Sequence, residues 1–531
     1  MMKNLLTLLL CIGFYAVNAQ QFDQLITDTI DYQSNPAYTK SELAYYPNHI
    51  VSTKLESKTI IYGQDIYGIE KIRVHDNLGN LVYNFTLGKS ACVKWIEATP
   101  GGKVYVAGTF MDTLNLNNLD TLIVNSPSLF NVNAFLLCIE PNGTLSWKRN
   151  LTLQHTNMQT IDMLTLDPAG NCWYSYCDWQ AGYIYGTDTN GQDITNRVLS
   201  GGIRSISGMS FDPSGNLYIS GAVENGTINI GSFSKVVTNL YNMYITRFNS
   251  SGQASWFIAI RDITFQNPRI QANSSGEAFF SGILLDSASM GSFSLPDPQF
   301  GWGLILAKID SSGNTLWLKG NPIMPTITGS FRVGTGHNVA ADDQGGCVLT
   351  GQTTGLVDWG NNVVSGQPTI GSVYTHTVLA WDQNGIAQWS LDATGSYVNP
   401  SSVILTSNTS GYTSGIVRGS IPYGPFQISQ PWQYTLSNAV VRFNFGPTGL
   451  SEESKDMNRS FYPNPTSGNV NFKQPLEAGM IELIDLNGRV VKNLFIPSGT
   501  STLELNLKPG YYLMNYRYRN SYSRMPVVIT D

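Results

Sequence analysis

The residues of this 531-residue chain that could act as nucleophiles, bases or metal ligands stand in no recognised catalytic spacing. The sequence has no G-x-S-x-G around a serine, no H-E-x-x-H for zinc and no phosphate-binding loop. Its histidines are isolated from one another in sequence, and we expect such residues to serve packing or loops. They are His49, His75, His155, His337 and His376. We assign no catalytic residue and identify no cofactor from the sequence.

One stretch has the composition of a cation site. Residues 188–193, DTNGQD, alternate oxygen-bearing side chains around Gly191. An EF-hand loop, however, has about twelve residues and ends in a glutamate, which this stretch lacks. A β-turn is therefore favoured, with weak Ca²⁺ binding as the alternative, and no metal ligand is assigned. The formal charge is −6 and no basic stripe exists to track a phosphate backbone, so we expect no nucleic-acid partner.

A turn followed by a short strand recurs along most of the chain. The clearest copy is FDPSGNLYISG at 211–221. There Asp212 opens the turn through its side chain, and Gly215 supplies the left-handed conformation. Related stretches bring the total to seven: 100–108, 167–174, 273–282 and 343–351, with fainter copies at 60–63 and 408–415.

A second turn, with the pattern D/N-x-x-G-x-x-x-W, alternates with the first. Both turns predict β-hairpins, so one copy of each makes four strands. Successive glycines at 143, 191, 252, 313 and 385 are spaced by 48, 61, 61 and 72 residues, which suits a four-stranded propeller blade with generous loops. The copies are 140–147, 249–256, 310–317 and 382–389, with weaker versions around Gly79, Gly191 and Gly446.

The sequence therefore predicts an all-β protein in which residues 20–446 form a β-propeller of about seven four-stranded blades. A blade alone would expose both faces of a small sheet, so the blades must stack in a ring. Four tryptophans occupy the same place in successive repeats. We expect them to pack blade against blade, and a ligand platform is the alternative. They are Trp147, Trp256, Trp317 and Trp389.

Over residues 50–446 these repeats resemble the bacterial seven-bladed propeller repeats of large secreted proteins, which carry a D-x-x-G-N-x-Y-x-x-G signature. They differ from the sialidase Asp box, D-x-G-x-x-W, by one residue in both intervals. They differ from quinoprotein blades, A-x-D-x-x-T-G-x-x-x-W, by a shorter Asp–Gly interval and a missing threonine. The shared part is the turn, so these comparisons supply no catalytic residue.

The first nineteen residues have the pattern of a secretory signal peptide. Lys3 supplies the positive charge, residues 5–17 are apolar, and Val17-Asn18-Ala19 places small residues before the cleavage point. The apolar run is too short to span a membrane. Five scattered cysteines remain after cleavage, and this odd number does not predict a disulfide framework.

The pattern changes after residue 446. Residues 447–460 are polar and charged and predict a linker. Residues 461–531 alternate in polarity between turn residues, which predicts a small β-sandwich. The most distinctive positions of this tail are Tyr462, Pro463, Asn464, Pro465, Asp485, Asn487, Gly488, Gly510 and Tyr511.

With these positions the tail resembles the type A C-terminal sorting domain of type IX secretion substrates in Bacteroidetes. The resemblance implies an Ig-like sandwich and passage through the Sec pathway and the periplasm. The type IX machinery would then deliver the protein to the outer-membrane surface or the medium. A sortase-like peptidase often removes such a tail and can couple the cargo to surface lipopolysaccharide. Family members often end on a basic residue, whereas this chain ends in VVITD.

Two functions remain open for the propeller. The first is a binding or scaffold module for a glycan or protein ligand, with its contacts on loops, since the strands are committed to packing. The second is a polysaccharide hydrolase or lyase with axial acid–base residues, where His337 and His376 could meet, so enzymatic activity stays open. Paired carboxylates or clustered histidines at the axis would favour the second function, and a Ser/Thr-lined channel the first. Candidate loop contacts are Phe300, Trp302, Trp432 and Tyr434.

Overall fold

The computed structural model describes residues 20–30, 41–62, 65–125, 131–153, 160–178, 180–262, 267–298, 302–322, 329–368, 373–429, 436–445, 461–462, 465–485, 490–518 and 521–530. The regular structure in these ranges is all β-strand. None of these segments is a helix of the length and apolarity that a membrane crossing requires. Contacts divide the chain into two compact units, one spanning Gln20–Phe445 and the other including Gly446–Asp531.

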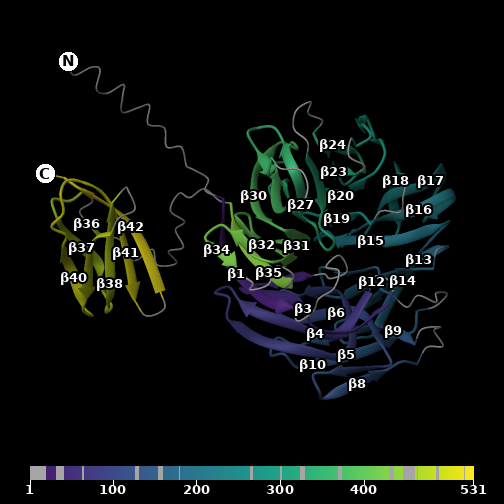
Figure 1. The fold of residues 1–531 in the computed structure, drawn as a ribbon, viewed down its shortest axis with the longest axis horizontal. Helices are drawn as coiled ribbons and strands as arrows, with labels where there is room; N and C mark the ends of the chain where they lie inside the picture. Colours follow the sequence, from purple (N-terminus) through teal and green to yellow (C-terminus); the bar gives the residue numbers. More distant parts are fainter. Residues whose placement is uncertain are drawn as a thin grey trace. The chain divides into compact units, whose positions relative to one another are not determined.

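The first unit is a seven-bladed β-propeller (Figure 1). Its described strands form seven antiparallel, four-stranded arrangements, each running from an inner strand near the axis to an outer strand at the rim. The inner strand of each blade contacts the inner strand of the next, and this ring of contacts closes on itself. The prediction of an all-β propeller with about seven blades is therefore confirmed.

Blades 1 and 2 share one long strand, β5 (Leu81–Ala98), which is the outer strand of blade 1 and then the inner strand of blade 2. The other strands of blade 1 are β2 (Leu43–Tyr46), β3 (His49–Tyr62) and β4 (Asp65–Asp76). Those of blade 2 are β6 (Val104–Met111), β9 (Val132–Ile139) and β10 (Leu145–Leu151), with a side hairpin of β7 (Thr113–Leu116) and β8 (Asp120–Ile123).

Blades 3 to 5 follow in chain order. Blade 3 contains β11 (Met163–Leu166), β12 (Cys172–Cys177), β13 (Ala181–Thr187) and β14 (Asp193–Ser200). Blade 4 contains β15 (Ile203–Phe211), β16 (Leu217–Ile230), β17 (Phe233–Phe248) and β18 (Ala254–Asp262). Blade 5 contains β19 (Arg269–Ala272), β20 (Ala278–Leu284), β23 (Gly303–Ile309) and β24 (Thr315–Gly320), with a side hairpin of β21 (Ala288–Met290) and β22 (Phe293–Leu295).

Blade 6 has an inner strand in two pieces, β25 (Gly329–Val333) and β26 (Val339–Ala341), both paired with the next strand. The residues between the two pieces leave the sheet and lie near the axis of the propeller. The remaining strands of this blade are β27 (Cys347–Asp358), β29 (Tyr374–Trp381) and β30 (Ala387–Gly395), with β28 (Val364–Gly366) beside β27.

Blade 7 is completed by the N-terminal strand. Strand β1 (Gln21–Ile30) lies antiparallel to β35 (Leu436–Asn444), and in Figure 1 the purple strand lies beside the green one. Asp23 of β1 accepts hydrogen bonds from Nε and Nη2 of Arg442 at 2.8 and 2.7 Å. The two ends of the propeller sequence thus join in one sheet. The other strands of this blade are β31 (Tyr397–Ser407) and β32 (Ser410–Arg418), with a side hairpin of β33 (Ile421–Tyr423) and β34 (Phe426–Ile428).

Both recurring turns are hairpin turns at one end of the ring. In blade 4 the Asp212 amide donates to the Asn216 carbonyl at 3.0 Å, and Asp212 Oδ1 accepts the Ser214 amide at 2.9 Å. Gly215 completes the turn with φ of 79°. Because successive strands are antiparallel, the first and third turns of each blade lie at one end, the turn face. The second turns and the connections between blades lie at the opposite end, the loop face.

One of the faint repeats is not a turn of this kind, and another lies where the structure is not described. Residues 60–62 belong to strand β3, and the inner hairpin of blade 1 turns instead at Pro47-Asn48. Gly446 lies outside the described residues. The outer neighbour of β35 is β1, so blade 7 requires no third turn. A count of sequence repeats could not reveal this, because the strand that completes the blade comes from the other end of the chain.

The tryptophans of the second turn motif lie between blades. Trp147 Nε1 donates to the Thr189 carbonyl in the third turn of the next blade at 3.1 Å. A Cβ atom placed on Gly191 of that turn would come within 3.0 Å of the Trp147 ring, so the ring rests on the glycine. Equivalent bonds join Trp256 to Ser311 at 3.1 Å and Trp317 to Gln383 at 3.0 Å. Trp389 packs against Phe445 with ring centroids 4.9 Å apart.

The second unit contains two small antiparallel sheets that share one apolar core, as in a β-sandwich. The core includes Val470, Ile481, Leu483, Met514 and Tyr516, all fully buried. One sheet contains β36 (Phe461–Tyr462), β37 (Asn469–Leu476) and β40 (Thr500–Glu504). The other contains β38 (Gly479–Asp485), β39 (Val490–Ile496), β41 (Gly510–Tyr518) and β42 (Ser521–Ile529).

Candidate functional site

Trp302 is the one loop candidate of the sequence analysis that lies within the described residues. It precedes β23 at the loop face, and 39% of its surface is exposed. The Arg332 guanidinium carbon lies 5.5 Å from the centroid of its ring. Arg332 is exposed and belongs to β25, the first piece of the inner strand of blade 6. Phe300, Trp432 and Tyr434 lie outside the described residues.

A second guanidinium covers an aromatic ring at the same face. Arg418, at the end of β32, places its guanidinium carbon 5.2 Å from the ring centroid of Tyr397, at the start of β31. Tyr374 meets Tyr397 edge to face, with ring centroids 5.9 Å apart. Burial raises the pKa of Tyr397, and the charges of Arg418 and Arg332 oppose that rise, so Arg332 lies within electrostatic range of both aromatic rings.

We call Trp302, Arg332, Tyr374, Tyr397 and Arg418 the arginine–aromatic strip. Neither arginine forms an ion pair with a carboxylate in the described part of the chain, and Arg418 Nε is buried without a hydrogen-bond partner there. Flat rings can stack on the apolar faces of sugars, and planar guanidinium groups bind carboxylates or sulfates through two parallel bonds. The strip therefore offers the two kinds of contact that an acidic glycan requires.

A charged cluster occupies the axis of the ring. His337 lies between the two pieces of the inner strand of blade 6, and both of its ring nitrogens face carboxylates. Nδ1 is 3.4 Å from Glu42 Oε2 of blade 1, and Nε2 is 3.6 Å from Glu97 Oε1 of blade 2. The Glu42 side chain is 1% exposed, whereas His337 and Glu97 are 19% and 26% exposed. We call these three residues the axial triad.

A cation–aromatic pair, Arg269 and Trp95, lies beside the axial triad. The Trp95 ring meets the His337 ring edge to face at 4.9 Å between centroids, and the Arg269 guanidinium lies over Trp95 at 4.9 Å. Arg269 donates to the carbonyls of Gly336, Thr335 and Ser207 at 2.9, 3.0 and 2.5 Å. Its hydrogen-bond donors are therefore committed to the backbone of the neighbouring blades.

Burial raises the pKa of Glu97 to about 7, and the Glu42 charge adds to this rise while His337 opposes it. Glu97 therefore carries a proton for part of the time near neutral pH. Burial also lowers the pKa of Arg269 to about 10, which leaves the guanidinium charged.

Sequence reasoning missed most of these axial residues, although a weak signal exists. His337 is five residues before Asp342, the first residue of the inner turn in its blade. The same position in other blades holds Lys94, Asp162, Ser207 and Pro268. When the polarity of such a position differs between blades although the turn that follows it stays the same, the position is a candidate site. Glu97 does not share this offset, and His376 is placed elsewhere, with Nδ1 bonded to Tyr423 and Nε2 near two threonine hydroxyls.

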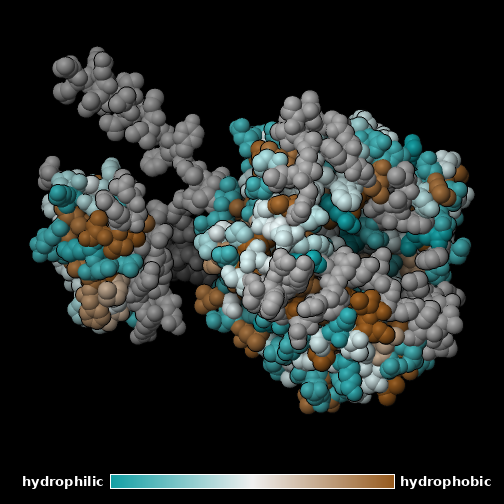
Figure 2. All heavy atoms as spheres, viewed as in Figure 1, coloured by the Kyte–Doolittle hydropathy of each residue, from teal (hydrophilic) through white to brown (hydrophobic). Residues whose placement is uncertain are grey.

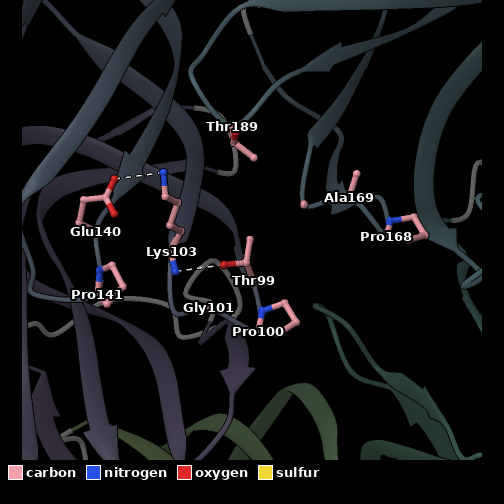
Figure 3. A pocket seen from close by; sticks show the side chains of 10 residues that line it. Thr99, Pro100, Gly101, Lys103, Glu140, Pro141, Pro168, Ala169 and Thr189 are labelled. Carbon is pink, nitrogen blue, oxygen red and sulfur yellow. Dashed lines mark hydrogen bonds and ion pairs between the residues drawn. The ribbon is translucent and has the colours of Figure 1, made fainter.

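A shallow hollow opens on the turn face between blades 2 and 3 (Figure 3). Its volume is about 310 Å³, and its lining includes Pro100, Pro141 and Pro168. On the blade 2 side of it, Lys103 Nζ and Glu140 Oε1 form an ion pair at 3.2 Å. The two charges in the hollow neutralise each other, so it presents no free charge to a ligand. On the propeller face of Figure 2, hydrophilic and hydrophobic residues are interspersed across the described surface.

The cation-like stretch at 188–193 forms the third turn of blade 3. Asp188 Oδ1 accepts the amides of Asn190 and Gln192 at 2.9 and 2.8 Å, so this carboxylate closes its own turn. Within the described ranges, no group of three or more His, Cys, Asp or Glu side chains is placed to hold a metal ion.

The described members of the distinctive tail positions lie in strands or beside them. Asp485 ends β38 opposite Tyr512, and Gly510 begins β41, where Tyr511 is 64% exposed. Pro465 is exposed, and Tyr462 belongs to β36. Pro463, Asn464, Asn487 and Gly488 lie outside the described residues.

Several solved structures resemble the chain at low sequence identity. A protein of unknown function from Bacteroides caccae is 12% identical, covering 61% of this chain and 89% of its own, with a TM-score of 0.33. Sqt1 from Saccharomyces cerevisiae is 9% identical, covering 76% and 86%, with a TM-score of 0.38. A gluconolactonase from Xanthomonas campestris is 11% identical, covering 62% and 91%, with a TM-score of 0.30. Likeness at this level says nothing about ligand or activity.

The search of curated proteins found no match to this chain. Residues 460–530 match the family model of the secretion system C-terminal sorting domain. The protein is therefore a β-propeller that carries a type IX C-terminal sorting domain, and it is exported across the outer membrane as a secreted or surface-attached protein.

Proposed function

We propose that the exported propeller is a binding module for an acidic extracellular glycan, held by the arginine–aromatic strip. The observation that carries this proposal is the pairing of two guanidinium groups with aromatic rings, without carboxylate partners among the described residues. Elsewhere in the propeller, arginines such as Arg73, Arg149 and Arg442 are paired with aspartates. Arg197 also lies over an aromatic ring without a carboxylate partner among the described residues, but it packs against Gly252 of the next blade, whereas Arg332 is exposed.

The loop face also suits a glycan because Trp302 and Arg332 are exposed there, while Tyr374 packs partly against the apolar core. Arg332 and Tyr397 belong to the inner strands of blades 6 and 7 at their loop-face ends, and Trp302 approaches from blade 5. A chain of sugar residues could therefore cross three blades, stacking on the rings while its acidic groups meet the guanidinium groups. A protein ligand is the alternative occupant of this face.

Binding of polygalacturonate and chondroitin sulfate to the mature chain, residues 20–531, tests the proposal, with dextran as the neutral comparison. We expect the acidic polymers alone to bind, and more weakly as salt rises, because exposed charge pairs are screened. Equal binding of dextran, or binding that salt leaves unchanged, would contradict the proposal.

Variants locate the site on the strip. Arg332→Ala and Arg418→Ala should each weaken binding by about tenfold or more, as expected for a lost charge-assisted contact. Arg332→Lys keeps the charge but loses the planar group, so it should restore only part of the affinity. Arg261→Ala is the matched control, because Arg261 is 56% exposed and already paired with Asp286. Loss of binding in the control alone would place the site elsewhere.

We also propose that a sortase-like peptidase removes the tail during export and that the mature protein is coupled to surface lipopolysaccharide. The match of residues 460–530 to the sorting domain supports this step. Mass spectrometry of the protein recovered from the cell surface would show a new C-terminus before residue 461 and an added mass. Recovery of the intact tail with residue 530 would contradict it.

A further inference from the structure

We propose that the axial triad is a pH-sensitive clasp, which holds residues 334–338 of blade 6 against the neighbouring blades in acidic and neutral solution and loosens them in alkaline solution. We call residues 334–338 the axial segment. The proposal uses no residue of the arginine–aromatic strip, and its test involves no glycan. It can therefore fail without affecting the proposed function.

The axial segment is bonded to the inner strand of blade 7. The amides of Thr335 and Gly336 donate to the carbonyls of Pro400 and Ser401 in β31 at 3.1 and 3.0 Å. The pairing of β31 with its own neighbour β32 shifts at the same place, between Pro400 and Val403. The inner strands of blades 6 and 7 thus leave their regular pairing together and contact each other near the axis.

Blade 1 joins this contact where the ring closes. The Ser41 amide donates to Ser401 Oγ at 3.0 Å, and Ser402 Oγ donates to Glu42 Oε2 at 2.8 Å. The backbone amide of His337 donates to Ser402 Oγ at 3.1 Å. These bonds link blades 1, 6 and 7 and place the His337 ring beside the Glu42 carboxylate.

The His337 ring lies between two carboxylates. Both ring nitrogens are buried, and among the described residues neither of them makes a hydrogen bond. Nδ1 is 3.4 Å from Glu42, and Nε2 is 3.6 Å from Glu97. A neutral imidazole has a single N–H group, so its other nitrogen must face a carboxylate with a lone pair. One more proton, on the ring or on Glu97, replaces this repulsion by attraction.

Glu97 is the group through which this proton is gained and lost. Its side chain is 26% exposed, whereas that of Glu42 is 1% exposed. Burial and the Glu42 charge raise the pKa of Glu97 from 4.5 to about 7, while His337 opposes the rise. Closing the clasp therefore takes up a proton. The stability that the clasp provides is present at acidic pH and is lost as pH rises through about 7.

Other titratable groups near the triad behave differently. Burial lowers the pKa of Arg269 to about 10, so its guanidinium stays charged at neutral pH. Burial also raises the pKa of the Cys172 thiol, which lies near Glu97, well above its ordinary range, so the thiol stays neutral. Asp162, which acts on Arg269, has a pKa raised by burial to about 6, while Lys94 and Arg269 oppose the rise. A variant that changes Glu97 alone separates its titration from that of Asp162.

Hydrogen exchange of the axial segment in residues 20–531 tests the clasp at pH 6, 7, 8 and 9. Each rate is divided by that of an unfolded peptide at the same pH, which gives a protection factor free of the chemical effect of pH. At pH 6 Glu97 is mostly protonated in the closed clasp, but ionised once the segment opens and its pKa returns to about 4.5. Protection should therefore fall about tenfold between pH 6 and pH 9.

Glu97→Gln replaces the titrating group by an amide that can donate to Nε2 at every pH, so it should lose most of this fall. Glu140→Gln is the matched control, because Glu140 belongs to the same blade and pairs with Lys103, and it should behave as the wild type. A static plug of the axis, the alternative, would give the same protection at every pH. Constant protection in the wild type, or equal falls in the wild type and Glu97→Gln, would overturn the proposal.

His337→Gln tests the part of the imidazole and keeps the experiment decisive if Glu97→Gln does not fold. Since His337 opposes the rise in the pKa of Glu97, removing the ring should move the fall in protection to higher pH. A fall at the same pH as in the wild type would show that Glu97 titrates without reference to His337, and it would also overturn the clasp.

Discussion

At each interface from blade 1 to blade 6, one side chain of an outer strand meets the third turn of the following blade. Trp147, Trp256 and Trp317 do so with a ring on a glycine and an indole N–H on a backbone carbonyl. In other blades Tyr83 approaches Gly143, and Arg197 approaches Gly252. A large, flat side chain is favoured at this position because it fills the wedge between two twisted sheets while its polar edge remains bonded.

Replacing Trp317 by alanine should destabilise the propeller by about 3–5 kcal/mol, the usual cost of removing a buried tryptophan. The side chain is 5% exposed and also loses its bond to Gln383. Urea denaturation of the mature chain measures the effect. Trp302→Ala is the control, because that ring is 39% exposed and its removal should change stability by less than about 1 kcal/mol. Equal losses in the two variants would contradict the packing role.

A buried carboxylate in blade 6 should give the stability a measurable pH dependence. Burial raises the pKa of Asp392 from its ordinary value near 3.8 to about 6, while hydrogen bonds from Thr377 Oγ1 at 2.8 Å and from the Gly366 amide at 2.7 Å oppose the rise. The protonated form therefore stabilises the fold below about pH 4, and this contribution disappears as pH rises through about 6.

Asp392→Asn removes this titration while keeping a side chain of the same shape. Compared with the variant, the wild type should be relatively most stable at pH 4 and should lose up to about 3 kcal/mol of that advantage by pH 7. Urea denaturation of both proteins at pH 4, 5, 6 and 7 measures the difference. A constant difference across this range would show that Asp392 keeps an ordinary pKa in the folded state.

Residue-level prediction from the sequence succeeds where a position repeats and fails where it does not. The aspartates and glycines of the turns can be identified because similar hairpin turns recur along the chain. The axial triad cannot, because Glu42, Glu97 and His337 come from blades 1, 2 and 6 and meet only across the closed ring. Unpaired arginines such as Arg332 were equally hidden, since pairing depends on neighbours from other blades.

At the scale of elements, the closed ring depends on strand β1, which the sequence repeats do not predict. Strand β1 supplies the outer edge of blade 7, while β35 at the other end of the propeller supplies its neighbour. Phe22 and Ile30 are each 2% exposed, and Asp28 pairs with Arg73 of blade 1. The alternation in 21–30 is compatible with a strand, but its partner lies over four hundred residues away, so pairing is a tertiary property.

Deletion of residues 20–30 should therefore open the ring. The loss of Phe22 and Ile30 alone removes burial worth about 3–6 kcal/mol, before the hydrogen bonds of nine paired residues are counted. We expect a lower melting temperature and a broader unfolding transition by calorimetry. Deletion of 461–531 is the control, because that segment belongs to the other compact unit and its loss should leave propeller melting unchanged. An unchanged transition in the first variant would exclude β1 as the closing strand.

At the scale of the whole molecule, the chain combines a ring that is closed by its own ends with a separate tail that directs export. Residues 460–530 carry the sorting domain, and the propeller retains its full set of seven blades without them. Export and the proposed ligand binding can therefore be tested independently of each other.

Removal of residues 461–531 should leave a folded propeller in the periplasm, since the type IX machinery recognises the tail. Cell fractionation followed by immunodetection of the propeller measures this outcome. A variant with a substitution only in the propeller, such as Arg261→Ala, should reach the surface normally. Appearance of the truncated protein on the surface or in the medium would show that the tail is dispensable for export.

The pairing of Gln21 with Asn444 places the first and last strands of the propeller in adjacent positions of one sheet. A short peptide between residues 20 and 445 would therefore make the propeller sequence circular without disturbing a blade. New ends could then be cut at an exposed hairpin such as β7–β8, where Leu119 is 87% exposed. Circular permutants of this kind would move the closing seam from blade 7 to any chosen blade, and they would let a sorting tail be fused at a different point on the ring.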